Sequence, residues 1–128
     1  MRSYAWTLGL LGAVALSGAS LAQEPSNQPS RLIEQPDWAR KPTGQDIARF
    51  YPSEAARKLI SGGAVIECAV TSEGLLADCH VVEEAPAGLG FGEAALKLSR
   101  IFKMRPVSKD GQPVAGGTVR IPILMMVS

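Results

Sequence analysis

The chain has 128 residues, enough for one small domain, and its 13 basic and 12 acidic residues nearly balance. A near-neutral chain lacks the basic surface that nucleic acid or an acidic membrane favours, so nothing in the composition argues for either partner, and we expect no nucleic acid. Its single histidine and two cysteines follow no known catalytic or metal-binding spacing, which leaves little material for an enzyme.

The amino-terminal residues have the layout of a secretory signal peptide. Arg2 precedes an uncharged, mostly apolar run over residues 4–16, and small residues follow at Ser20 and Ala22. The run is short for a membrane span, which needs about 20 residues. We therefore expect residues 1–22 to be a signal peptide that is cleaved after Ala22, with a retained membrane anchor as the alternative.

Residues 23–44 contain four prolines among Gln, Ser, Asn and Glu, a composition that cannot bury a core. We expect a flexible, partly extended lead there, followed by one domain over residues 45–128. Trp38 is the exception in this lead, and we expect it to cover an edge of the domain. Cleavage would remove only the charge of Arg2, so the exported protein would carry 12 basic and 12 acidic residues.

A first helix is predicted after Tyr51, because Pro52 suits the first helical position. Its apolar stripe at helical spacing consists of Ala55, Ala56, Leu59 and Ile60. Gly62 and Gly63 are expected to end the helix, since glycine is common after a helix C-terminus. Residues 46–50 are expected to add one more turn upstream.

A β-hairpin is predicted over residues 63–82, where two apolar runs flank a Ser-Glu-Gly turn that ends at Gly74. Side chains alternate between the two faces of a strand, so one face is apolar. The apolar face is expected to hold Ala64, Ile66, Cys68, Val70, Leu75, Ala77, Cys79 and Val81. The polar face is expected to hold Glu67, Thr71, Asp78 and His80.

With the turn at Gly74, Cys68 faces Cys79 and Glu67 faces His80 across the hairpin. Two cysteines in an exported protein favour a disulfide, with two buried thiols as the alternative. The histidine is expected to form an exposed ion pair with Glu67 rather than to act in catalysis. A zinc site is rejected, because the cysteines and His80 lie on opposite faces.

The second half of the domain is predicted to hold one helix and one strand. Residues 83–90 have loop composition, and a second amphipathic helix is predicted over residues 92–103, before Pro106. A final strand begins at Thr118, and Pro122 marks it as an edge strand because proline cannot donate to a ladder.

The predicted order is helix, strand, strand, helix, strand. This order favours an α+β, two-layer fold, in which two helices pack on one face of a small antiparallel three-stranded sheet. No nucleophile–base pair, metal ligand set or cofactor motif can be assembled from the sequence. We therefore expect no catalytic residues, no metal, no cofactor and no small-molecule substrate.

Several short motifs follow one another along the chain in an informative order. They are Tyr51-Pro52, Val70-Thr71-x-x-Gly74, Ile101-Phe102-Lys103-Met104-Arg105-Pro106, Gly111-x-Pro113-Val114 and Val119-x-Ile121-x-Ile123. Over residues 45–126 this series resembles the carboxy-terminal domain of the TonB family of energy transducers.

The resemblance implies a periplasmic domain that binds a protein or peptide partner, with an outer-membrane TonB-dependent transporter among the candidates. Binding would occur by β-augmentation, in which a partner segment adds to the last strand. The implied partner-binding residues are Val119, Arg120, Ile121, Pro122, Ile123 and Leu124. A plain edge strand, protected by Arg120 and Pro122 against unwanted pairing, explains the same residues.

The chain departs from a full transducer of that family in its first 44 residues. Its apolar segment contains no histidine, and a 22-residue lead reaches at most about 70 Å. We therefore expect an exported periplasmic domain that is used alone. The alternatives are an inner-membrane-anchored transducer subunit that faces the periplasm and, last, a metal-binding or enzymatic protein.

Mass spectrometry of the native protein tests the export hypothesis directly. Cleavage after Ala22 predicts a mature amino terminus at Gln23, because the small residues at Ser20 and Ala22 fit the cleavage-site pattern. Substitution of Ala22 by a bulky residue should block cleavage and leave the precursor. An intact terminus at Met1 or Arg2 in the unsubstituted protein would support the anchored alternative instead.

Overall fold

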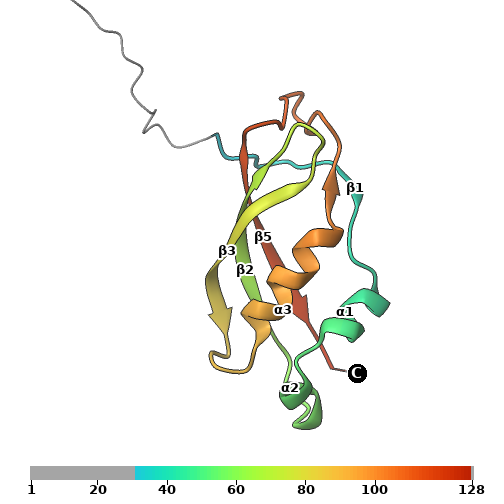
Figure 1. Cartoon of the computed structure of the whole chain (residues 1–128), viewed down its shortest axis with the longest axis vertical. Helices are drawn as coiled ribbons and strands as arrows, with labels where there is room; N and C mark the ends of the chain where they lie inside the picture. The colour runs from blue at the N-terminus through green and yellow to red at the C-terminus, as the bar shows by residue number, and fades with distance from the viewer. Residues whose placement is uncertain (1–30, 128) are drawn as a thin grey trace, which may run out of the picture.

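The computed structural model describes residues 31–127. Its main sheet is antiparallel with strand order β3-β2-β5. These strands are β2 (Gly62–Val70), β3 (Leu76–Ala85) and β5 (Thr118–Met125). Helix α3 (Phe91–Leu98) lies across one face of the sheet (Figure 1). The predicted α+β class and the three-stranded sheet are confirmed; residues 1–22, the expected signal peptide, lie outside the described residues.

A second, smaller sheet stands beside the first. Strand β1 (Trp38–Arg40) pairs antiparallel with the short strand β4 (Lys103–Met104). The ring of Trp38 packs on Phe102, with 4.9 Å between the ring centroids. Strands β1 and β4 cover an edge of the domain, where Trp38 was expected to lie.

Part of the expected flexible lead lies against the domain. Ile33 is buried in the hydrophobic core, and Leu32 forms a parallel bridge with Thr118. The backbone N–H of Lys109 donates to the carbonyl of Gln35 at 2.8 Å. Residues 31–44 therefore contribute β1 and one core side chain, although their composition is that of a linker.

The helix predicted after Tyr51 is α2 (Ser53–Arg57), and the extra turn expected over residues 46–50 is a separate helix, α1 (Gly44–Phe50). Thr43 and Asp46 form a capping box at the start of α1. The hydrogen bond from the Thr43 backbone N–H lowers the pKa of the Asp46 carboxyl. This Thr-x-x-Asp spacing was a usable signal for a separate helix.

The end of α2 differs from the prediction, because the helix stops before the glycines. Leu59 has φ of 56°, the left-handed conformation, and the residue is 73% exposed. The N–H of Ile60 donates to Ala55 O at 2.9 Å, and that of Leu59 donates to Ala56 O at 3.2 Å. These two bonds are a Schellman ending, so Leu59 is not part of an apolar stripe.

The hairpin has the predicted register only at its centre. Glu67 pairs with His80, and the two cysteines are joined in a disulfide. Strand β3 contains two bulges, one on each side of this centre. An extra residue reverses the alternation of faces. Between the hairpin turn and the bulge nearest to it, Leu76 therefore turns toward the core. Leu75, which was predicted to be buried, is 45% exposed.

The loop expected over residues 83–90 is wrong in its first part, because β3 continues through a second bulge to Ala85. This bulge also turns the side chain of Glu84 toward the helix side of the sheet. Its carboxylate accepts a hydrogen bond of 3.0 Å from the N–H of Gly92, in the first turn of α3. Because Gly90 has no side chain with which to cap the helix, Glu84 supplies the cap from the sheet.

The second predicted helix, over residues 92–103, is shorter than expected. A 3-10 turn, η1 (Ser99–Ile101), follows α3, and the chain then enters β4. The N–H of Met104 donates to the carbonyl of Gly74 at 2.8 Å. Gly74 has φ of 85°, and a Cβ there would collide with the Met104 carbonyl oxygen. After η1 the chain therefore pairs with the hairpin turn at Gly74 instead of continuing as a helix.

Substitution of Leu59 tests the helix ending. Leu59→Gly should raise the free energy of unfolding by about 0.5–1 kcal/mol, because glycine adopts positive φ without the strain of a β-carbon. Lys58→Gly is the matched control and should lower it, since φ at Lys58 is an ordinary −92°. Urea denaturation measures both. Destabilisation by Leu59→Gly would contradict the left-handed ending.

Candidate functional site

Strand β5 is an edge of the main sheet, because β2 pairs with only one of its sides. The N–H of Val70 donates to Gly117 O at 2.9 Å, so the backbone groups of Gly117 face β2. Backbone groups of successive residues in a strand point to opposite sides. The N–H and C=O groups of Arg120, Pro122 and Leu124 therefore point away from β2; we call these groups the free edge.

The first outward residue of β5 is already paired. Thr118 donates its N–H to Arg31 O at 2.9 Å, and its carbonyl accepts from the Ile33 N–H at 2.7 Å. Beyond it, no backbone of the described residues 31–127 continues this pairing. The free edge offers three carbonyls and the N–H groups of Arg120 and Leu124, since Pro122 has none.

A groove of about 360 Å³ runs along the free edge. Its apolar floor includes Trp38, Ile47 and Phe102, and Lys41 stands among its lining residues. Lys41 forms no ion pair with any residue that the structure describes. An extended segment placed in this groove would have apolar contacts on the helix side of the sheet.

The face of the main sheet opposite α3, which we call the outer face, carries a row of charges across all three strands. Glu67 on β2 accepts a hydrogen bond of 2.6 Å from Arg120 Nε on β5. Its other carboxylate oxygen lies 3.6 Å from His80 Nε2 on β3. Glu67 therefore holds the Arg120 side chain over the sheet, while the backbone of Arg120 points to the free edge.

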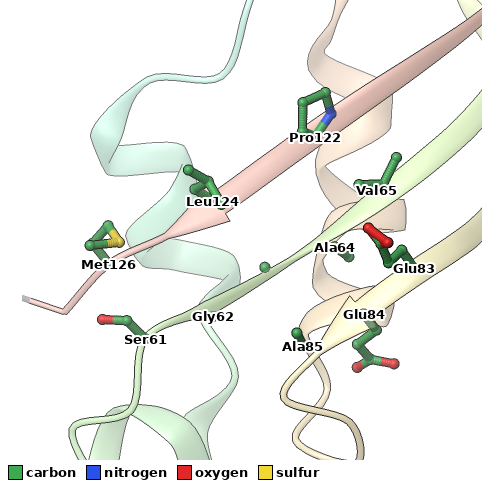
Figure 2. Close-up of a pocket in the computed structure, with 11 residues that line it drawn as sticks. Ser61, Gly62, Ala64, Val65, Glu83, Glu84, Ala85, Pro122, Leu124 and Met126 are labelled. Atoms are coloured by element: carbon green, nitrogen blue, oxygen red, sulfur yellow. The ribbon is translucent and has the colours of Figure 1, made fainter.

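Beside this row the outer face carries a group of apolar side chains. A hollow of about 390 Å³ lies on this face. Figure 2 shows Val65, Pro122, Leu124 and Met126 around it, with Glu83 on its β3 side. Leu124 and Met126 are each 71% exposed. Pro122 and Leu124 also line the groove along the free edge, so the two hollows meet at β5.

The cysteines and the histidine considered in the sequence analysis do not belong to the free edge. Cys68 is buried on the core side of the sheet, where its sulfur bonds to Cys79. His80 lies on the outer face, away from the disulfide. Among the residues described, no cluster of three or more His, Cys, Asp or Glu side chains could hold a metal ion. Within residues 31–127, no helix has the length and apolarity needed to cross a membrane.

The predicted partner-binding residues, Val119 to Leu124, form one continuous stretch of β5. Only the alternate residues Arg120, Pro122 and Leu124 present backbone groups outward, while the side chains of Val119, Ile121 and Ile123 are buried. Sequence reasoning missed the opposite side of the groove. Trp38 was the only available signal, as an aromatic residue in a polar lead.

A family model described as Gram-negative bacterial TonB protein C-terminal matches residues 48–124. An uncharacterized protein of Caulobacter vibrioides is 31% identical over 64 residues, which are 50% of this chain and 64% of the relative. The chain thus spans less than two thirds of that relative's length.

Two solved structures are similar to the chain. The solution NMR structure of the Pseudomonas aeruginosa TonB CTD has a TM-score of 0.54 at 16% identity and covers 77% of this chain and 95% of that one. At that identity the similarity concerns the fold. The TonB2 protein of Vibrio anguillarum has a TM-score of 0.43 at 16% identity, covering 91% of this chain and 98% of that one, which is too low for an inference.

The charge row predicts a measurable stability difference between two glutamates. Glu67→Gln should lower the free energy of unfolding by about 1 kcal/mol, because Glu67 is 25% exposed and faces two basic side chains. Glu83→Gln is the matched control and should change it by less than about 0.5 kcal/mol, since Glu83 has no partner within residues 31–127. Urea denaturation compares them, and equal losses would mean that the row contributes nothing.

Proposed function

This chain belongs to the family of Gram-negative bacterial TonB protein C-terminal domains, and on that premise we propose that it is an exported periplasmic binding domain. It binds an extended segment of a partner protein or peptide by β-strand addition to β5. A TonB-dependent transporter of the outer membrane is the partner class that the family favours. The domain acts by binding and not as an enzyme.

The observation that carries this proposal is the unpaired free edge. Arg120, Pro122 and Leu124 direct five backbone hydrogen-bonding groups away from β2, and no backbone of the described residues pairs with them. Each hydrogen bond to such groups contributes about 0.5–1.5 kcal/mol net. An exposed strand edge with room beside it is the surface that β-augmentation uses.

The groove supports the same mode of binding. Side chains of an added strand alternate, so half of them would face the floor formed by Trp38, Ile47 and Phe102. The other half would extend the outer face beside Arg120, Pro122 and Leu124. Backbone bonds would supply affinity that depends little on sequence, and the two sets of side-chain contacts would supply selectivity.

A membrane-anchored transducer subunit is the second candidate, and the apolar run over residues 4–16 favours it. That run lies outside the described residues. Both candidates use the same edge of β5, and they differ only in whether residues 1–22 remain attached.

A proline substitution at Arg120 tests strand addition. Arg120→Pro removes an N–H that points outward, so the ladder with β2 is retained while the free edge loses one of its two donors. Arg120→Ala is the matched control, because it removes the same side chain and keeps the N–H. Partner binding should fall about 2- to 13-fold further with proline than with alanine, in line with one net hydrogen bond.

The binding assay uses a photo-crosslinking residue in place of Leu124, at the exposed end of the edge, in protein expressed in a Gram-negative periplasm. Crosslinked products provide the partner, and their yield is compared between the Arg120→Pro and Arg120→Ala proteins. Circular dichroism confirms that both variants are folded. Equal yields from the two variants would place the interface elsewhere.

A further inference from the structure

The chain itself performs a short strand addition at the start of β5. Leu32 forms a parallel bridge with Thr118. The two hydrogen bonds of this pairing join Thr118 to Arg31 and Ile33, at 2.9 and 2.7 Å. They use the outward N–H and C=O groups of Thr118, which are the same kind of groups that Arg120 and Leu124 leave open. Residues 31–33 thus occupy the first position on the edge that is proposed to receive the partner.

This pairing is anchored by packing. Ile33 is 6% exposed and belongs to the core cluster. A Cβ at Gly117 would lie 2.7 Å from the Ile33 Cδ1 atom, so the chain at Gly117 approaches Ile33 as closely as a glycine permits. The Arg31 guanidinium also donates to the carbonyl of Pro113. Displacing residues 31–33 would expose the Ile33 side chain and break these bonds together.

After Ile33 the chain leaves β5 and forms the opposite side of the groove, which we call the far wall (Pro36, Trp38, Lys41 and Pro42). Trp38 belongs to both the far wall and the floor, because its ring packs on Phe102. The far wall is fixed to the loop after β4, because Arg105 donates its N–H to Asp37 O at 2.8 Å. Two of its four members are prolines, which have no N–H to offer. A strand in the groove would therefore find its backbone partners on β5.

We propose that residues 31–33 are a built-in stop that sets one end of the partner strand. The partner that fits is an extended segment of about five residues, paired over Arg120 to Leu124, whose chain ends or turns away from β5 beside Ile33. This inference rests on the proposed strand addition and adds its boundary and length. Without the stop, pairing would continue to Thr118.

A tethered guest strand tests the boundary without knowledge of the natural partner. The guest is a seven-residue segment of alternating Thr and Val, joined to Ser128 of the full chain by a Gly/Ser linker. A linker of about 12 residues has a root-mean-square span of about 19 Å, enough to reach along an edge of about 14 Å in either direction. A guest with proline at alternate positions is the matched control.

The readout is amide hydrogen exchange measured by NMR. Pairing of the guest should slow exchange of the Arg120 and Leu124 amides at least tenfold relative to the proline guest, while the Ile33 and Thr118 amides keep their rates. Faster exchange of the Ile33 amide on guest binding would overturn the inference, since the guest would have displaced the stop. Unchanged rates at both Arg120 and Leu124 would overturn strand addition itself, and the stop with it.

A second variant is designed to release residues 31–33 from Thr118. Ile33→Pro keeps an apolar side chain but removes the N–H that donates to Thr118 O. In this variant the Thr118 amide should exchange faster without the guest and should be slowed when the guest is attached. The same pattern of protection with and without Ile33→Pro would show that residues 31–33 set no boundary, and would overturn the inference while leaving strand addition intact.

Discussion

Strand β2 pairs on both sides, and the alternation of its ladder with β5 determines what the domain can present to a partner. The ladder uses the backbone groups of alternate residues, so those of Arg120 and Leu124 are left pointing outward. The same alternation turns Val119 and Ile121 into the core, which fastens β5 to the sheet without using its outer edge. One set of alternate residues in β5 therefore attaches the strand to the sheet, and the other set leaves its backbone groups open for pairing. The two sets do not compete for the same backbone groups.

Much of the fold could be predicted from the sequence, because strong local patterns coincide with it. Alternating apolar residues and a turn glycine predicted the hairpin, and its centre placed Glu67 opposite His80, where the structure has them. The bulges could not be predicted. Asp78 adopts a φ of 51°, which aspartate tolerates better than most residues, but an aspartate on the polar side of a strand does not by itself indicate a bulge. A single inserted residue then reverses the faces of everything beyond it, which is why Leu75 was assigned wrongly.

Of the two sides of the candidate site, only the β5 edge could be predicted from the sequence, and the far wall could not. An edge strand at β5 follows from Pro122, a signal contained within the strand. The far wall depends on contacts between residues that are distant in sequence, such as Trp38 with Phe102 and Ile33 with Gly117. Composition over residues 23–44 indicated a linker, and composition cannot reveal that one isoleucine fits a space left by a distant glycine. The cap that Glu84 provides to α3 escaped prediction for the same reason.

The two bulges of β3 have a consequence for assembly. A three-stranded sheet has two open sides, and a domain with two regular sides can add copies of itself indefinitely into a fibre. Here the bulges interrupt the regular spacing of backbone groups along β3, so that side is a poor template for another strand. Growth at β5 is then limited to one added strand per domain, because a second copy offers no regular β3 edge to continue the sheet. The sheet of the described residues thus has one regular open edge, at β5, and no second regular edge at β3 to which a further copy could add.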